Sequence, residues 1–241
     1  MAPLPVGCHV RKDSMDPTRS SSYTGIRKEI ADLVPEGARS ILDIGCSNGA
    51  LGAWLKRGRP DRRVVGLEFD PGFCAEATSR LDRALRADLN ESAWPAALTG
   101  EQFDCIVAAD LLEHLVDPGG SLAIACGFLR PGGHVVISVP NIRHIVALHR
   151  IFWKGRFPRE PRGLFDSTHL RWFTYDDLID LLVATGLVAE TSSFNLRVTD
   201  DGRGTLNRIV RKIPRRLQGL APVREFLAYQ FCVRAVKPGA G

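Results

Sequence analysis

The sequence predicts an α/β fold with a doubly wound, seven-stranded, mostly parallel sheet, an antiparallel last strand and a helical cap insertion. Short apolar runs alternate with helical patterns, which is typical of a parallel sheet with helices on both faces. A glycine-bearing loop follows the first run and opens a helix, where such folds present backbone amides to a ligand. The 241 residues, 44% of them hydrophobic, suffice for one large core.

The expected elements follow one another closely along the chain. Residues 26–34 carry apolar side chains at helical spacing and end before Pro35, which predicts a short amphipathic helix. The parallel strands are expected at residues 40–44, 64–69, 84–88, 103–110 and 134–140. The helices between them are expected at residues 50–57, 73–85 and 121–130.

The C-terminal part adds one helix and two strands. Thr174, with Asp177 three residues later and a closing Gly186, predicts a capped helix over 174–186. Strands are expected at 187–196 and 228–236, and the long stretch between them leaves them free to pair antiparallel.

A single domain is expected over residues 23–241, after a flexible N-terminal arm over residues 1–22 that lacks any apolar period. The arm also lacks the basic-then-apolar order of a secretory signal, so we expect a cytoplasmic location. No window approaches the roughly 18 consecutive apolar residues of a membrane-spanning helix. The six cysteines contain no CxxC pair, which indicates reduced thiols packed as small apolar groups.

Two segments carry most of the positive charge. Residues 143–162 hold six Arg or Lys against Glu160 alone, and residues 203–224 hold seven against no acid. We interpret them as a basic cap insertion at about 143–165 and a basic insertion at about 200–224, facing an anionic ligand, polymer or membrane surface. Residues 206–220 have an amphipathic pattern found at membrane surfaces, although packing on their own domain is the alternative.

The glycine-bearing loop ILDIGCSNGALG (41–52) predicts a cofactor site. Gly45 and Gly49 would let the chain turn sharply and a ligand approach closely. Ser47 replaces the second glycine of a dinucleotide fingerprint, which disfavours a pyrophosphate. Asp43, Glu68 and Asp88 end successive expected strands, an arrangement that suits a cationic nucleoside ligand such as S-adenosylmethionine, with Glu68 on the ribose hydroxyls.

The chain resembles the class I S-adenosylmethionine-dependent methyltransferases over residues 23–196. The motifs that carry the resemblance are DIGCSNG (43–49), GLEFD (66–70), AD (87–88), FDCIVAADLLEHL (103–115) and LRPGGHVVISVPN (129–141). Ser47 departs from it, because many members have a third glycine there.

The resemblance implies a Rossmann-like fold and a cofactor site. Asp43, Gly45 and Gly49 would line the methionine part, Asp88 would approach the adenine amine, and Asp110 would lie beneath the methionine amine or the substrate. The implied cofactor contacts are Tyr23, Asp43, Gly45, Cys46, Gly49, Glu68, Phe69, Asp88, Leu89, Asp110, Leu111 and His114.

A hydroxyl acceptor needs a group that removes its proton. His169, in DSTHLRWFT (166–174), is the candidate base because it lies between the fifth strand and the next helix, where substrates enter this fold. Asp166 would orient its imidazole, and Arg171 would pair with an acidic substrate group or with Asp166.

A metal site is the alternative for the same region. Asp110, Glu113 and His114 resemble the E-x-x-E-H element of ubiquinone-pathway O-methyltransferases and of bacterial small-RNA 2′-O-methyltransferases, and His169 would be the fourth ligand. Such oxygen and imidazole ligands would suit Mg²⁺, Mn²⁺ or Fe²⁺. A metal is not favoured, because related enzymes without a metal also carry the Glu-His pair.

The expected function is therefore O-methylation of a sugar or other small-molecule hydroxyl, with S-adenosylmethionine as donor and His169 as general base. DSTHLRWFT and SVPN (138–141) look most like the MetW-related, glycan- and natural-product-associated branch. The basic cap suits a phosphorylated or lipid-linked acceptor. Four alternatives stay open: metal-assisted 2′-O-methylation of RNA, N-methylation of a small molecule, a nicotinamide-dependent oxidoreductase, and a non-catalytic partner protein.

Overall fold

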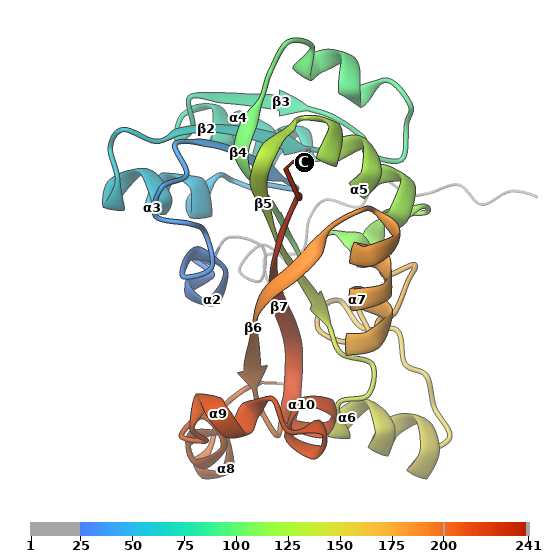
Figure 1. The fold of residues 1–241 in the computed structure, drawn as a ribbon. Coiled ribbons are helices and arrows are strands. Elements are labelled where there is room, and N and C mark those ends of the chain that lie inside the picture. The colour runs from blue at the N-terminus through green and yellow to red at the C-terminus, as the bar shows by residue number, and fades with distance from the viewer. Residues whose placement is uncertain (1–24, 200, 240–241) are drawn as a thin grey trace, which may run out of the picture.

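The computed structural model describes residues 25–199 and 201–239, which build one seven-stranded sheet in the order β3-β2-β1-β4-β5-β7-β6 (Figure 1). The expected N-terminal arm and Tyr23 lie outside the described residues. The strands are β1 (Ser40–Ile44), β2 (Arg63–Glu68), β3 (Arg83–Arg86), β4 (Phe103–Ala109), β5 (Leu129–Pro140), β6 (Val188–Leu196) and β7 (Ala228–Val236).

The strand directions confirm the expected sheet. The first five strands pair in parallel, whereas β7 pairs antiparallel with both β5 and β6. In the centre of the sheet, Ile41 lies opposite Val64 on β2 and Cys105 on β4. The carboxyl ends of β1, β2 and β4 therefore meet at one edge, where this fold class binds its ligands.

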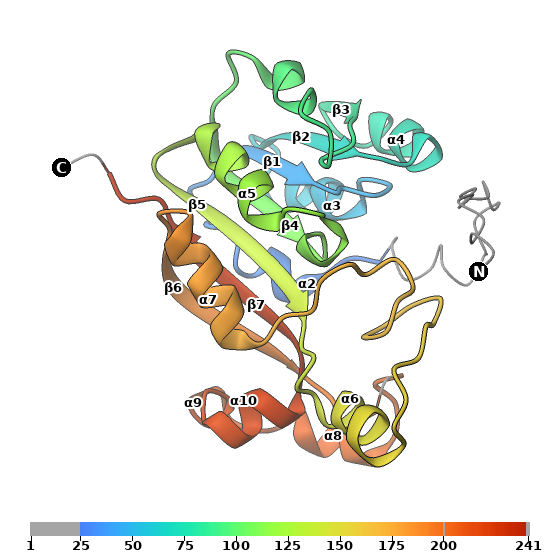
Figure 2. The same ribbon diagram turned by 90° about the vertical axis from the view of Figure 1, so that its right-hand side faces the viewer.

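Helices cover both faces of the sheet (Figure 2). The layer of α2 (Lys28–Ala31), α3 (Ala50–Gly58) and α4 (Pro71–Thr78) buries one apolar cluster, which includes Ile30, Leu55 and Ala77. On the other face, η1 (Trp94–Leu98), η2 (Leu112–His114), α5 (Pro118–Gly127) and α7 (Tyr175–Ala184) bury a larger one. The alternation of strands and helices in the sequence thus becomes a three-layer sandwich.

Three helices differ from the expected bounds, and the first of them, expected at 26–34, is the four-residue α2. The expected helix 73–85 is α4, which ends at Thr78 because Asp82 then turns the chain back to the sheet, accepting a hydrogen bond from the Val64 amide at 2.7 Å. The expected helix 121–130 is α5, which begins after Asp117; the Asp117 carboxylate accepts from the Gly120 amide. Residues 129–133 belong to β5, so the Pro-Gly-Gly sequence lies within a strand.

The two basic insertions lie at the same end of the molecule (Figures 1 and 2). The first forms α6 (Ile145–Leu148) and η3 (His149–Trp153), followed by a loop without helix, so the cap is helical only over its first third. The second forms α8 (Thr205–Val210), α9 (Arg215–Gln218) and α10 (Ala221–Leu227). An ion pair of 3.2 Å between Arg143 and Glu225 joins the two insertions. Among the described residues, no helix has both the length and the apolar character to cross a bilayer.

Candidate functional site

A cavity of about 590 Å³ opens at the carboxyl edge of the sheet, within the range of small-molecule sites. Eight of the expected cofactor contacts line it: Gly45, Glu68, Phe69, Asp88, Leu89, Asp110, Leu111 and His114. The expected reaction-centre residues Asp166 and His169 line the same cavity. The structure thus brings the two predicted groups of residues to one space.

The loop after β1 places its backbone against Glu68. Gly45 has φ +72°, and a Cβ there would lie 3.1 Å from the Leu111 side chain. Ser47 has φ +49°, a left-handed conformation that favours glycine. The serine that departs from the family pattern therefore adopts a conformation that is costly for a residue other than glycine. Its amide donates to Glu68 Oε2 at 2.7 Å.

Glu68 is held as a hydrogen-bond acceptor at the end of β2. Its second oxygen, Oε1, accepts from the Asp70 amide at 2.9 Å. Burial raises the pKa of the carboxyl, although the backbone hydrogen bonds act in the opposite direction. The carboxylate borders the cavity, and the Ser47 and Asp70 amides hold it in place. Its remaining lone pairs can therefore accept hydrogen bonds from two neighbouring hydroxyls of a ligand.

Asp43 is buried behind the same loop. It borders a smaller neighbouring cavity together with Cys46, rather than the large one. Burial, with a contribution from the nearby Glu68, raises the pKa of Asp43 to about 7. Its Oδ2 is buried without a hydrogen-bond partner among the described residues. An unsatisfied buried acceptor of this kind suits a ligand that donates a hydrogen bond, such as an amine, directly or through water.

The Asp43 pKa predicts a stability effect. In the unfolded chain a carboxyl titrates near 3.8, so between about pH 4 and pH 7 the folded state holds a proton that the unfolded state loses. The free energy of unfolding should therefore fall as pH rises through this window, by roughly 1.4 kcal/mol per pH unit. Urea denaturation at pH 5 and pH 7 should show that the free energy of unfolding decreases less for Asp43→Asn than for wild type. Asp61→Asn is the surface control and should behave like wild type. Equal decreases in the free energy of unfolding for Asp43→Asn and wild type would contradict the prediction.

Gly49 has a packing role in the structure, and its expected ligand contact stays a prediction. A Cβ at this position would lie 3.1 Å from both the Ala77 backbone and the Leu81 side chain, and Gly49 borders neither cavity. The glycine has φ +76° and allows α3 to begin close to α4. The neighbouring helix and the left-handed backbone conformation are therefore each a reason for glycine at this position.

Arg27 is a site residue that the sequence interpretation missed. Its guanidinium borders both cavities and lies 2.5 Å from the Asp110 carboxylate. Asp110 also accepts from Ser138 Oγ at 2.7 Å and from the Gln230 amide. The periodicity of residues 26–34 marks only their apolar face, so nothing in the local pattern distinguishes Arg27 from a solvated arginine. In the structure it supplies a cation that suits a ligand carboxylate.

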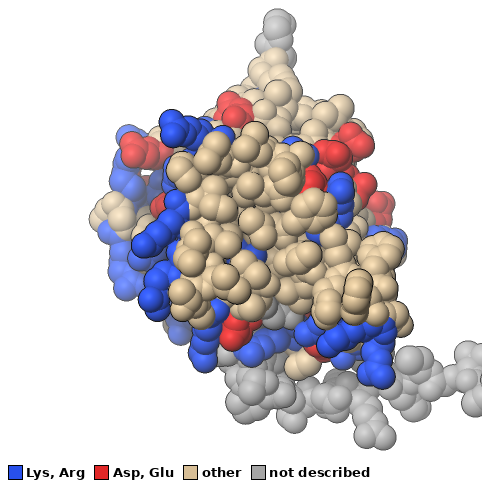
Figure 3. Space-filling model, turned by 90° about the horizontal axis from the view of Figure 1, so that it is seen from below, with Lys and Arg blue, Asp and Glu red and all other residues tan. Residues whose placement is uncertain are grey.

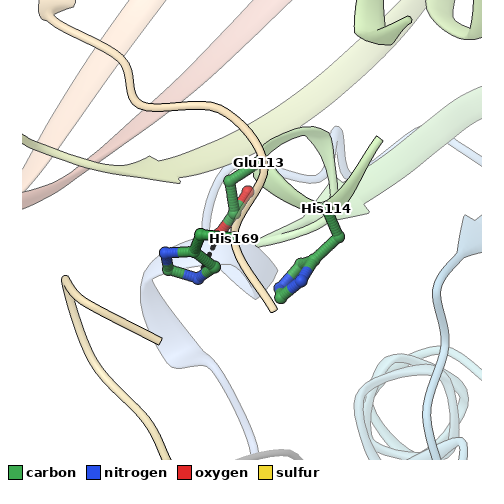
Figure 4. A group of neighbouring side chains, drawn as sticks. All are labelled: Glu113, His114 and His169. Atoms are coloured by element: carbon green, nitrogen blue, oxygen red, sulfur yellow. Dashed lines mark ion pairs between the residues drawn. The ribbon is translucent and has the colours of Figure 1, made fainter. Parts of the chain in front are cut away.

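His169 lies with Glu113 and His114 at one wall of the cavity (Figure 4). The Nε2 of His169 is 4.0 Å from Glu113 Oε1, and the rings of His169 and His114 meet edge to face with centroids 4.8 Å apart. Burial lowers the pKa of His169, and the neighbouring His114 lowers it further. Burial also raises the pKa of Glu113, which is 1% exposed. The imidazole of His169 is therefore mostly neutral near pH 7, and burial favours the protonated form of Glu113 relative to a carboxyl in water.

Asp166 and Arg171 have other hydrogen-bond partners than the expected ones, and their expected roles stay predictions. Asp166 Oδ1 accepts from the amide and hydroxyl of Thr168, at 2.9 and 2.7 Å. The imidazole of His169 is oriented instead by a backbone carbonyl, since its Nδ1 lies 3.4 Å from the oxygen of Leu164. Arg171 donates to the Val116 carbonyl at 2.6 Å and does not border the cavity, because its loop points the side chain along η2.

Three of the four residues expected as metal ligands lie close together in the structure. Glu113, His114 and His169 bring donor atoms within 4.8 Å of one another. Asp110 is not among them, because its carboxylate is occupied by Arg27. Glu113 Oε2 is buried without a hydrogen-bond partner among the described residues, so it could serve as an oxygen ligand. The described part of the chain thus offers an incomplete set of nitrogen and oxygen ligands, to be completed by water or substrate.

The groups at this edge of the sheet can be compared with the chemical groups of the methyl donor. A carboxylate for ribose hydroxyls, an unsatisfied acceptor near the loop and a cation beside Asp110 lie around one edge of the sheet. These groups match the ribose, the amine and the carboxylate of S-adenosylmethionine. Among the described residues, Arg27 and Arg162 are the arginines that line the cavity, and the loop after β1 lacks the dinucleotide fingerprint.

Comparisons with known proteins agree with the site. Residues 19–192 match the model of a methyltransferase domain. A ubiquinone biosynthesis O-methyltransferase of Cereibacter sphaeroides is 30% identical over 165 residues, which cover 66% of this chain and 64% of that protein. The chain spans less than two thirds of the length of the first curated relatives it matches.

Solved structures share the fold. An S-adenosylmethionine-dependent methyltransferase of Thermotoga maritima has a TM-score of 0.60 at 16% identity and covers 91% of each chain. Another, from Mesorhizobium loti, has a TM-score of 0.56 at 20% identity and covers 86% of this chain and 95% of its own. The match to the domain model extends over well more than half of the sequence. The chain therefore belongs to the methyltransferase-domain family, and it shares its fold with S-adenosylmethionine-dependent methyltransferases of known structure.

Proposed function

We propose that this protein transfers the methyl group of S-adenosylmethionine to a hydroxyl of a small polyhydroxylated molecule, such as a sugar, with His169 as general base. The observation that carries the proposal is the position of His169. Its imidazole lies in the wall of the cavity that also contains Glu68, with Nδ1 3.4 Å from the Leu164 carbonyl oxygen and Nε2 4.0 Å from Glu113 Oε1.

The donor side of the cavity is built by Glu68 and Arg27. When bound, S-adenosylmethionine supplies an electrophilic methyl group on a positively charged sulfur. Glu68 would accept hydrogen bonds from the ribose hydroxyls, while Arg27 would pair with the amino-acid carboxylate. These contacts would fix the direction in which the methyl group faces, and positioning is the largest contribution to an in-line displacement.

The acceptor side depends on the tautomer of His169. A carbonyl oxygen only accepts hydrogen bonds, so the contact between Nδ1 and the Leu164 oxygen requires the proton on Nδ1. Nε2 then carries the free lone pair. Because burial lowers the pKa of His169, this lone pair is available at pH 7 and can take the proton of an acceptor hydroxyl.

Oxygen as the accepting atom has a second line of support. The curated relatives are named as O-methyltransferases of ubiquinone biosynthesis. Their match covers 66% and 45% of this chain, and acceptor contacts in such folds lie on loops that vary between enzymes. We therefore carry over the oxygen acceptor and not the ubiquinone precursor itself.

A panel of acceptors tests the proposal. Formation of S-adenosylhomocysteine would be measured with sugars, phenols and amines of similar size, before and after treatment with EDTA. We expect turnover with hydroxylated compounds and a rate that changes by less than about twofold after EDTA, since proton removal by His169 needs no ion. Turnover of amines alone would contradict the oxygen acceptor. Loss of activity with EDTA, restored by Mg²⁺ or Mn²⁺, would replace the general base by the metal cluster.

A further inference from the structure

Large apolar side chains are exposed on the two basic insertions. Phe152 and Trp153, at the end of η3, are 80% and 85% exposed. On the second insertion, Leu206 and Ile209 of α8 are 61% and 59% exposed, and Leu220 follows shortly after α9. Most of the exposed large apolar residues of the described chain lie on these insertions, so they form more than the scattered apolar residues of an ordinary surface.

Unpaired cations accompany these apolar side chains. Lys154 follows Trp153 directly, and Arg208, Lys212 and Arg216 lie among the apolar residues of α8 and α9. All four are exposed, and none forms an ion pair with a carboxylate of the described residues. Of the acids on the described parts of these insertions, Glu160 and Glu225 are paired with arginines, and Asp201 accepts hydrogen bonds from the Thr199 hydroxyl and the Arg203 amide.

The two insertions form one face of the molecule, which we name the lower face and define as residues 143–157 and 203–227. The ion pair between Arg143 and Glu225 joins them, and Arg143 also lies over the Phe226 ring. Seen from below, a broad area of mostly uncharged residues has Lys and Arg along its left and lower borders and a few Asp and Glu at other points of its border (Figure 3). The apolar and the basic groups therefore point to the same side.

We propose that the lower face docks on an anionic lipid bilayer. A surface with exposed Trp, Phe and Leu side chains surrounded by Lys and Arg matches both the acyl-chain region and the anionic headgroup region of such a bilayer. The aromatic rings enter the boundary between headgroups and acyl chains, while the cations remain at the level of the lipid phosphates. Short helices such as α6, α8 and α9 can lie in this plane without crossing it.

Other occupants fit less well. Two copies of this chain related by a twofold axis would bring the cations of both lower faces together, and like charges repel. An RNA backbone would neutralise the cations, but it would leave Leu206, Ile209 and Leu220 against a charged polymer. A bilayer satisfies both kinds of side chain at once.

Vesicle binding of the full-length protein tests the proposal. Vesicles of phosphatidylcholine with 30% phosphatidylglycerol would be compared with pure phosphatidylcholine by co-sedimentation at low salt. We expect binding to the anionic vesicles, a shift of tryptophan emission to shorter wavelength, and release at 0.5 M salt. The Trp153→Phe variant should still bind but should lose most of the emission shift.

Two matched pairs of variants separate the apolar and the ionic contributions. Phe152→Ser with Trp153→Ser should weaken binding by about tenfold or more, whereas Val183→Ser with Val188→Ser, which removes exposed apolar residues elsewhere, should not. Each removed cation should weaken vesicle binding by roughly fivefold, so Lys212→Gln with Arg216→Gln should weaken it by about 30-fold. Lys28→Gln with Arg57→Gln should leave vesicle binding unchanged. All four residues of the test pairs are exposed, so the fold should be retained.

Three outcomes would overturn the proposal. The first is no sedimentation with anionic vesicles at low salt, and the second is equal loss in the test and control variants. The third is a concentration-dependent dimer, or tighter binding of a short RNA, that is abolished by the lower-face variants. Because vesicle binding is measured without methyl donor or acceptor, its failure would leave the proposed methyl transfer untouched.

Discussion

The Glu68→Ala variant is expected to bind S-adenosylhomocysteine roughly 100-fold more weakly than wild type, or not measurably. The ribose hydroxyls would lose two hydrogen bonds to a carboxylate, each worth about 1.5–3 kcal/mol. Glu68 also holds the Ser47 and Asp70 amides, so its removal loosens the loop that shapes the site. Isothermal titration calorimetry measures the change directly.

Two further variants make the Glu68 result specific. Glu91→Ala removes an exposed carboxylate outside the cavity and should leave the affinity unchanged. Glu68→Gln keeps one acceptor oxygen and should lie between wild type and Glu68→Ala. Unaltered affinity in Glu68→Ala, with a melting temperature close to that of wild type, would show that the ribose lies elsewhere.

The His169→Gln variant is expected to lower kcat by about 10² to 10⁴, the usual contribution of a positioned general base. The affinity for S-adenosylhomocysteine should stay within about threefold of wild type, because the imidazole serves the acceptor side. His149→Gln is the matched control, since His149 is exposed and does not border the cavity. Equal kcat values for His169→Gln and wild type would remove His169 from the reaction.

The pH dependence of the His169 reaction has a definite sign. The base acts only when unprotonated, and its pKa lies below the ordinary value of 6.5. The rate of the wild-type enzyme should therefore be level above pH 7 and should fall as the solution is acidified below about pH 6.5. In His169→Gln this acid limb should disappear, because no imidazole is left to protonate. An acid limb that persists unchanged would assign it to another group.

Much of the sheet follows from the sequence, because its signals are local. The central parallel strands β1, β2 and β4 are mostly apolar runs with an acidic residue at or next to the strand end, and such runs are buried on both faces, whereas the edge strand β3 is short and partly exposed. Glu68 was predicted as the ribose ligand from its place at a strand end alone, and it borders the cavity. The helix bounds were less predictable, since α4 ends where Asp82 bonds to β2, a contact between distant residues.

The side-chain partnerships within the site could not be predicted in the same way. Arg27 reaches Asp110 across 83 positions of the chain, and the partner of His169 Nδ1 is a backbone oxygen, which has no residue signature. Arg171 lies two positions from His169 yet turns away to Val116. Sequence position identifies the edge of the sheet to which a residue belongs, whereas the loop conformation decides where its side chain points.

The most direct test of the whole account is a crystal structure of the complex with S-adenosylhomocysteine. The account predicts that both ribose hydroxyls bond to Glu68, that the amino-acid carboxylate lies beside Arg27, and that the sulfur faces the space in front of His169 Nε2. A ligand with its ribose away from Glu68, or with its sulfur directed away from His169, would contradict it.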